Sequence, residues 1–273
     1  MTTFYSPDRN PLPLASRSSG LDALHTVPST PKFPSRLALS PLIEPAKGLP
    51  MTSGHSAWLT PLVYTLGQWI VLPIYFGGLK VTGQEHLPPQ GPVILAPTHR
   101  SRWDAITVPY TTGLRVTGRH PRFMVSANEV KGIQGWFIRR LGGFPVDTEH
   151  PRVASLRHGV EVLQAGEMLV IFPEGGIFHD RHIHPLKPGM ARLALQAEQG
   201  KPGLGIKIVP ISVHYSDLIP KWRTRIQIAI GHPLSVPDYC QGSVKQSAQK
   251  LTDDLEAALK ALAASHENHH GMR

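Results

Sequence analysis

The chain has 273 residues, 41% of them hydrophobic, which is enough for one large domain or two small ones with an ample core. Its 28 lysines and arginines outnumber 19 acidic residues, and the formal net charge of +9 favours anionic partners such as nucleic acid, anionic lipid headgroups or phosphate-bearing substrates. The single cysteine, Cys240, excludes an intrachain disulfide and favours a location that faces the cytosol.

The first 50 residues are rich in proline and serine and lack a sustained hydrophobic period, so we expect residues 1–50 to be disordered. No apolar stretch follows a basic start, which argues against a secretory signal. A transit peptide is a second interpretation because such peptides are also rich in serine and poor in acidic residues. The prolines disfavour the amphipathic helix that transit peptides use.

An uncharged apolar run extends from Ser56 to Leu79, with tryptophans and tyrosines spread through it. A bilayer span needs about 20 apolar residues, so the run is long enough to cross a membrane. Glycines and prolines interrupt it, however. We therefore expect residues 51–85 to form a helical hairpin of two short helices in the headgroup region, where tryptophan and tyrosine are favoured. A buried hairpin in a soluble core is the alternative.

After Lys80 the pattern becomes that of an α/β domain, which we assign to residues 86–240. Strand-length apolar runs occupy residues 93–96, 123–125, 144–146, 168–172, 206–213 and 226–230. Stretches with helical character occupy residues 102–112, 133–141, 151–165 and 188–199. This alternation predicts a mixed, largely parallel sheet that helices cover on both faces. Residues 241–273 are expected to form a last helix, about 243–264, and a polar tail.

A histidine and an aspartate, His99 and Asp104, follow the apolar run that ends at Pro97. Functional residues often follow buried strands in this way, and an imidazole can take a proton from a hydroxyl. Five helical positions turn about 140°, so the two side chains can meet only if His99 precedes a helix and Asp104 lies in its first turn. Ser101 and Asp104 also resemble a capping box. At this point a catalytic pair and a helix cap are equally supported.

A second polar group follows the apolar run at residues 169–172, where Glu174 and Gly175 come directly after a proline. The glycine would let backbone N–H groups approach a ligand, and the glutamate could bond a substrate hydroxyl. A surface turn is the ordinary alternative.

The order of these motifs resembles that of the glycerophospholipid acyltransferase family, which includes the lysophosphatidic acid acyltransferases. The residues that carry the resemblance are His99-x4-Asp104 and Phe172-Pro173-Glu174-Gly175, with residues 135–147 matching the family's second block and residues 208–211 its fourth. Four blocks in the correct order are more specific than any single one. The resemblance covers roughly residues 55–235.

The resemblance implies transfer of a fatty acyl group from a thioester to a lysophospholipid hydroxyl, with 1-acylglycerol-3-phosphate as the expected acceptor. It implies that His99 is the general base and that Asp104 orients it. It further implies that Glu174 and Gly175 help to bind the acceptor and that Pro210 shapes the acyl-donor side. The expected partners are acyl-CoA or acyl-carrier protein and membrane lipids at the cytoplasmic face. No metal and no cofactor are expected.

Two departures from the family pattern affect the acceptor. Thr148 stands where the second block usually has an arginine, and Gly176-Ile177 replaces the Thr-Arg that usually continues the third. Phosphate binding favours charge-assisted donors, and the basic residues that could supply them are Arg139, Arg140, Arg152 and Lys187. A different lysolipid or alcohol acceptor, or a catalytically idle lipid-binding protein on this fold, are therefore alternatives.

The segment His179–His184 has metal-like residue types but lacks the spacing of a zinc site, so we expect a solvated loop beside the active site. Zinc-finger, RNP and helix-turn-helix patterns are not found in the sequence, and we expect no nucleic-acid partner.

Overall fold

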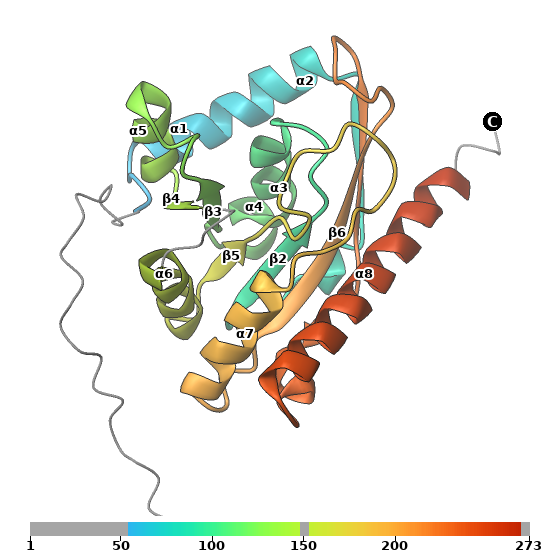
Figure 1. Cartoon of the computed structure of the whole chain (residues 1–273). Coiled ribbons are helices and arrows are strands. Elements are labelled where there is room, and N and C mark those ends of the chain that lie inside the picture. The colour runs from blue at the N-terminus through green and yellow to red at the C-terminus, as the bar shows by residue number, and fades with distance from the viewer. Residues whose placement is uncertain (1–53, 148–152, 269–273) are drawn as a thin grey trace, which may run out of the picture. The chain divides into compact units, whose positions relative to one another are not determined.

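An eight-stranded sheet forms the centre of the computed structural model, which describes residues 54–147 and 153–268 (Figure 1). The strands are β1 (Gly78–Thr82), β2 (Val93–Pro97), β3 (Arg122–Ser126), β4 (Gly143–Val146), β5 (Met168–Val170), β6 (Lys207–Tyr215), β7 (Arg225–Ile230) and β8 (Leu234–Ser235). Their order is β1-β7-β6-β2-β5-β3-β4, and β8 pairs with β6. The predictions made for residues 1–50, Thr148 and Arg152 lie outside the described residues.

Most neighbouring strands run parallel, and only the pairs β6–β7 and β6–β8 are antiparallel. The predicted mixed, largely parallel sheet is therefore confirmed. All five residues of β2 are buried, as expected for a central strand with helices on both faces. The sequence did not reveal β1, because its short alternating run was read as the end of the apolar segment.

Helices cover both faces of this sheet. They are α1 (Leu59–Leu66), α2 (Leu72–Tyr75), α3 (Asp104–Thr112), α4 (Leu114–Thr117), α5 (Gly132–Arg140), α6 (Val153–Gln164), α7 (Gly189–Gly200) and α8 (Val244–Asn268). One apolar core lies between the sheet and α6, α7 and α8. A second core lies on the opposite face and includes Leu72 and Phe76 near α2 and Val108 of α3. Figure 1 shows α1 and α2 on the side of the molecule away from α7 and α8.

The expected helical hairpin is wrong, because α1 and α2 are joined into one continuous helical rod, residues 59–75. A π-turn, Gly67–Val71, connects them, and the Leu72 N–H donates to the Gly67 carbonyl five residues back. The wider turn includes Gly67 without ending the helix. Pro73 then lies in the first turn of α2, where a proline is tolerated. Residues that looked like breaks therefore change only the pitch of the helix.

The rod presents a row of large apolar side chains to solvent. The exposed ones are Trp58, just before α1, and Leu62, Leu66, Trp69, Ile70 and Ile74. None of the helices within residues 54–147 and 153–268 is both long and apolar enough to cross a membrane.

Candidate active site

His99 lies just beyond the carboxyl end of β2 and is held at several points. Its backbone N–H donates to Glu174 Oε2 (3.0 Å), and its carbonyl accepts from the Phe178 N–H (2.9 Å). Its ring stacks on Phe172 at a centroid distance of 3.9 Å. The imidazole is therefore fixed in place before any substrate arrives.

Asp104 is the first residue of α3, and its side chain contacts the ring nitrogen Nδ1 of His99. The His99 Nδ1–H donates to Asp104 Oδ2 at 2.9 Å, and the backbone N–H groups of Arg100 and Ser101 donate to the same oxygen at 2.7 and 2.8 Å. The predicted arrangement, with His99 before the helix and Asp104 in its first turn, is confirmed. The bond from the Ser101 N–H resembles one half of a capping box, but α3 begins at Asp104 and its N-cap, Trp103, makes no side-chain cap bond, so the predicted cap at Ser101 is not formed.

The second carboxylate oxygen of Asp104 is bonded by Tyr215, at the end of β6. The Tyr215 hydroxyl donates to Asp104 Oδ1 at 2.7 Å, and the Asp104 side chain is fully buried. Burial, followed by the Asp104 charge, raises the pKa of Tyr215, so the phenol keeps the proton that it donates. Asp104 thus accepts four hydrogen bonds, and a carboxylate in this place stabilises an imidazolium at His99.

Glu174 follows β5 and lies beside His99, but its oxygens are occupied by protein donors. Arg100 donates to it through Nη1 (2.8 Å) and Nη2 (3.0 Å), and the N–H groups of His99 and His184 each donate at 3.0 Å. Its side chain has no exposed surface. We expected this carboxylate to bond a substrate hydroxyl, whereas the structure uses it to fix the residues around His99.

The strand register explains why these two motifs meet. Leu95 of β2 lies opposite Val170 of β5, and His99 and Glu174 each follow four residues later. Both side chains therefore lie at the same edge of the sheet, beyond the carboxyl ends of parallel strands, where ligands bind in open α/β folds.

The ring nitrogen Nε2 of His99 is the one that remains for chemistry. It has no hydrogen bond to any residue in the described part of the chain. A neutral imidazole with Nδ1–H held by a carboxylate presents Nε2 as a proton acceptor. The site can therefore take a proton from a hydroxyl and return it to a leaving group.

Gly175 lies against a basic side chain. Its φ is +75°, and a Cβ added there would lie 2.7 to 2.9 Å from the Cε, Cδ and Nζ atoms of Lys187. The positive φ favours glycine, whereas the flexible end of the Lys187 side chain could move away from a Cβ. Lys187 is exposed, and its N–H donates to the Pro173 carbonyl at 2.9 Å. Among those candidate basic residues that the structure describes, Lys187 is thus the one that contacts the Glu174–Gly175 turn.

The other sequence candidates lie elsewhere. Arg139 and Arg140 end α5 next to Gly142, which accepts from the Phe123 N–H at the beginning of β3, at the opposite edge of the sheet from His99. The carbonyls of both arginines accept from residues just before α1. Pro210 lies within β6 beside Ala96, and its carbonyl accepts from the Gly231 N–H. The structure does not bring these three residues to the His99 turn.

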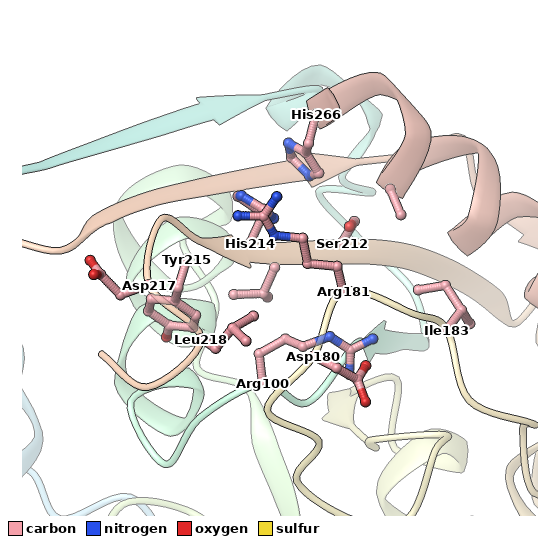
Figure 2. A pocket seen from close by; sticks show the side chains of 12 residues that line it. Arg100, Asp180, Arg181, Ile183, Ser212, His214, Tyr215, Asp217, Leu218 and His266 are labelled. Carbon is pink, nitrogen blue, oxygen red and sulfur yellow. The ribbon is translucent and has the colours of Figure 1, made fainter. Parts of the chain in front are cut away.

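A small hollow of about 30 Å³, open to solvent, lies beside Arg100 (Figure 2). Figure 2 shows Arg100 and Asp180 on one side of it and His266 on the other, with Arg181 between them. His99 is not among the described residues that line this hollow, so it is separate from the reacting nitrogen.

The segment His179–His184 forms a loop with its own internal pairing. Asp180 bonds His184 Nε2 at 2.8 Å, and this hydrogen bond lowers the pKa of Asp180. The His182 carbonyl accepts from Arg100 at 2.8 Å. Among the described residues, no group of three or more His, Cys, Asp or Glu side chains is arranged so that it could hold a metal ion.

The residues that sequence reasoning missed are Arg100, Phe172 and Tyr215. Arg100 and Phe172 stand inside the two quoted motifs, so their position was a signal, but their contacts depend on the pairing of distant strands. Tyr215 gave no signal in the sequence, because it reads as the last residue of an apolar strand.

Comparisons with known proteins indicate the family of the chain. The Acyltransferase family model matches residues 78–214, which include both the His99 and the Glu174 motifs. A 1-acyl-sn-glycerol-3-phosphate acyltransferase of Bacillus subtilis is 28% identical over 188 residues, which cover 68% of this chain and 88% of that protein. One of Streptococcus pneumoniae is 28% identical over 153 residues, or 53% of this chain, and the chain spans about half of its length (51%).

A solved structure shares the fold. The crystal structure of the 1-acyl-sn-glycerophosphate acyltransferase PlsC from Thermotoga maritima matches with a TM-score of 0.57 over 79% of this chain and 80% of that chain. The sequence identity is 20%.

Proposed function

The chain belongs to the acyltransferase family, and we propose that it transfers a fatty acyl group from a thioester to the free hydroxyl of 1-acylglycerol-3-phosphate in phospholipid synthesis. The observation that carries the proposal is the His99 imidazole, whose Nδ1–H is bonded to the buried Asp104 carboxylate while Nε2 is left for a substrate. The names of the two bacterial relatives support the acceptor.

The proposed first step is proton transfer from the acceptor hydroxyl to His99 Nε2. An alcohol is a weak nucleophile until this proton is removed. The Asp104 carboxylate at 2.9 Å stabilises the imidazolium that forms and keeps the ring in the correct orientation. In this proposal His99 is the catalytic residue, and Asp104 acts through it.

In the second step the alkoxide oxygen forms a bond to the thioester carbonyl carbon and gives a tetrahedral oxyanion. The carbon–sulfur bond then breaks, and the thiolate takes the proton from the His99 imidazolium. The ester and the free thiol are the products, and His99 is neutral again. The substrates and His99 supply every proton and electron pair in this sequence, so the proposal includes no metal and no cofactor.

Glu174 is assigned a positioning role. Its carboxylate accepts from the backbone of His99 and from both terminal nitrogens of Arg100, which is itself buried. This pair connects the turn after β2 to the turn after β5. We propose that it holds the backbone of His99 rather than the acceptor.

The acceptor phosphate is assigned to the turn at Gly175. Lys187 lies against this glycine and supplies a cation close to the His99 motif, in place of the arginine that the family has two positions after this glycine. A lysine binds phosphate as a point charge and without the paired geometry of arginine. Arg152 and Thr148 stay untested because they lie outside the described residues.

Membrane contact is assigned to the helical rod, residues 59–75, with its exposed apolar row. Tryptophan and isoleucine side chains in such a row are suited to the interface between headgroups and acyl chains. The rod would hold the enzyme on the cytoplasmic face of a membrane, where acyl-CoA or acyl-carrier protein can deliver the acyl group and lysolipids are found.

The test is acyl transfer by purified protein with acyl-CoA or acyl-carrier protein as donor and a panel of lysolipids as acceptors. We expect 1-acylglycerol-3-phosphate to be the preferred acceptor and His99→Ala to abolish transfer. His232→Ala, at an exposed histidine, is the matched control. Binding of lysolipids without product would reject the enzyme, whereas product only with another acceptor would reject the substrate assignment. Wild-type turnover by folded His99→Ala would reject the mechanism.

A further inference from the structure

The loop that connects β6 to β7 carries large apolar side chains that nothing in the described chain covers. Leu218 is 51% exposed, Ile219 69% and Trp222 59%. A hydrophobic group of this size at the tip of a surface loop is unfavourable in water unless a partner covers it. The catalytic proposal above makes no use of this loop.

A network of polar contacts holds the base of the loop rigid. Asp217 accepts from the hydroxyls of Ser216 (3.0 Å) and Thr224 (2.8 Å) and pairs with Lys221 at 2.7 Å. These contacts lower the pKa of Asp217, with the Lys221 bond as the largest cause. The Lys221 N–H donates in turn to the Thr224 hydroxyl at 2.9 Å. These contacts therefore hold the turn that carries the exposed apolar side chains.

The same loop is fastened to the end of the helical rod. The Arg223 N–H donates to the Tyr75 carbonyl at 2.8 Å, and the Tyr75 hydroxyl donates to the Pro220 carbonyl at 3.4 Å. The Trp222 ring packs edge-on against the Tyr75 ring at 6.0 Å. Arg223 has a φ of +64°, which only such tight support makes tolerable in a residue other than glycine. The loop and the end of the rod thus lie side by side (Figure 1).

The distribution of exposed apolar side chains points in the same direction. All but two of the large exposed ones in the described chain belong to the rod and the residue before it, to α3–α5 or to this loop. The two exceptions are Val153 on α6 and Val244 on α8, which belong to the opposite layer of helices. Monomeric soluble proteins scatter such residues singly, so their concentration around the rod marks an interaction surface.

Charge and position identify the partner. Lys221 and Arg223 in this loop and Arg225 at the start of β7 are exposed and would meet anionic headgroups. The tip also adjoins the reaction site, because Tyr75 stacks on Trp103 at 4.7 Å and Trp103 directly precedes Asp104. A lipid acceptor that leaves the bilayer here would be next to the His99 motif.

We propose that the β6–β7 loop is a second bilayer contact, whose Ile219 and Trp222 insert among the acyl chains of an anionic membrane beside the rod. This inference rests on the proposed membrane function of the rod and adds an element that the rod does not require. Two contacts at separate points fix the orientation of the enzyme, so that its active site opens toward the lipid.

The direct test uses a polarity-sensitive fluorophore on an introduced cysteine, with the only native cysteine removed as Cys240→Ser. The labelled positions are Ile219→Cys in the loop, Ile70→Cys on the rod and Val153→Cys on the opposite helix layer. Vesicles contain phosphatidylcholine with and without phosphatidylglycerol. We expect the labels at 219 and 70 to shift to the blue and to be shielded from an aqueous quencher, more strongly with phosphatidylglycerol. The label at 153 should not change.

A second measurement removes the apolar tip. Ile219→Ser should weaken vesicle binding about tenfold, as expected when one aliphatic side chain no longer inserts, whereas Val153→Ser should bind as the wild type does. Circular dichroism and thermal unfolding verify that each variant is folded. Both substitutions should leave transfer to a detergent-dispersed acceptor unchanged.

Each other outcome has a distinct meaning. A shift at 70 without a shift at 219 would leave the rod as the membrane contact and overturn the loop proposal alone. Absence of vesicle binding by the wild type would overturn the membrane part of the proposed function and this inference with it, but not the acyl transfer. If Ile219→Ser kept full vesicle binding and lost only activity with acyl-carrier protein, the surface would belong to that protein and the inference would be wrong.

Discussion

Asp104→Asn offers a clean separation of charge from geometry at the proposed base. The oxygen Oδ2 accepts from two backbone N–H groups and from His99 Nδ1. These donors would orient the new side chain so that its amide oxygen occupies the same place. The amide NH₂ would then face the Tyr215 hydroxyl, which can accept as well as donate. The imidazole would keep its tautomer and position, and only the negative charge at position 104 would be lost.

The size of the effect follows from the distance and the burial. The two groups are 2.9 Å apart, and the carboxylate is fully buried, so salt does not screen the interaction. At an effective dielectric constant of about 20, two unit charges about 4 Å apart interact by about 4 kcal/mol. We take about 3–4 kcal/mol as the stabilisation that the carboxylate charge gives the imidazolium in the transition state. Its loss in Asp104→Asn should lower kcat/KM by about 100- to 1,000-fold.

The assay is thiol release from acyl-CoA at saturating acceptor, with Asp253→Asn, at an exposed aspartate of α8, as the matched control. Equal urea unfolding curves for Asp104→Asn and the wild type would verify that the geometry survives. If the folded Asp104→Asn protein kept kcat/KM within threefold of the wild type, the carboxylate charge would have no catalytic role. Asp104 would then serve only to hold the backbone of the turn that precedes α3.

Three further substitutions test the structure around the site and the rod. Tyr215→Phe leaves Asp104 Oδ1 without its donor and should lower the free energy of unfolding in urea by about 1.5–3 kcal/mol; an unchanged urea midpoint would contradict the bond. Burial lowers the pKa of His55 from 6.5 to about 4, so the unfolded chain binds the extra proton. The free energy of unfolding should therefore fall by about 1–2 kcal/mol from pH 6.5 to pH 4. The value is modest because solvent reaches part of the ring. In His55→Gln this part of the pH dependence of stability should be absent. Gly142→Ala would place a Cβ 2.5 Å from His55 Nε2 at a φ of +91°. It should lower the free energy of unfolding by about 2 kcal/mol more than the control Gly118→Ala, at a position that also has a positive φ but is surrounded by open space. Equal thermal midpoints of the two variants would count against the close contact.

The regular part of the fold was readable from the sequence because burial imposes a period on it. The central strands and five of the helices, α3 and α5 to α8, were predicted within a few residues, for example α6 from the spacing of its apolar positions. The rod was misread because glycine and proline normally end helices. Gly67, the first residue of the π-turn, lies next to Ile106 of α3, and no local pattern in the sequence encodes this contact.

The site was readable only where its residues are close in the chain. The geometry of His99 and Asp104 followed from a spacing of five and the pitch of a helix. The role of Glu174 did not, because the sequence shows a carboxylate but not the four donors that occupy it. Those donors come together through the register of β2 and β5, which only the folded sheet sets.

The Arg100–Glu174 pair has a consequence for attempts to transplant this chemistry. Glu174 joins three segments, the turn at His99, the turn after β5 and the loop at residues 182–184, through one buried carboxylate. Substitutions among these partners would be strongly non-additive, because removing one donor leaves the others around an incompletely paired charge. A scaffold given only the His99-x4-Asp104 segment would acquire the base and its carboxylate. It would lack the Arg100–Glu174 pair that holds the backbone of His99 in place. The smallest portable unit is therefore two parallel strands with both of their terminal turns.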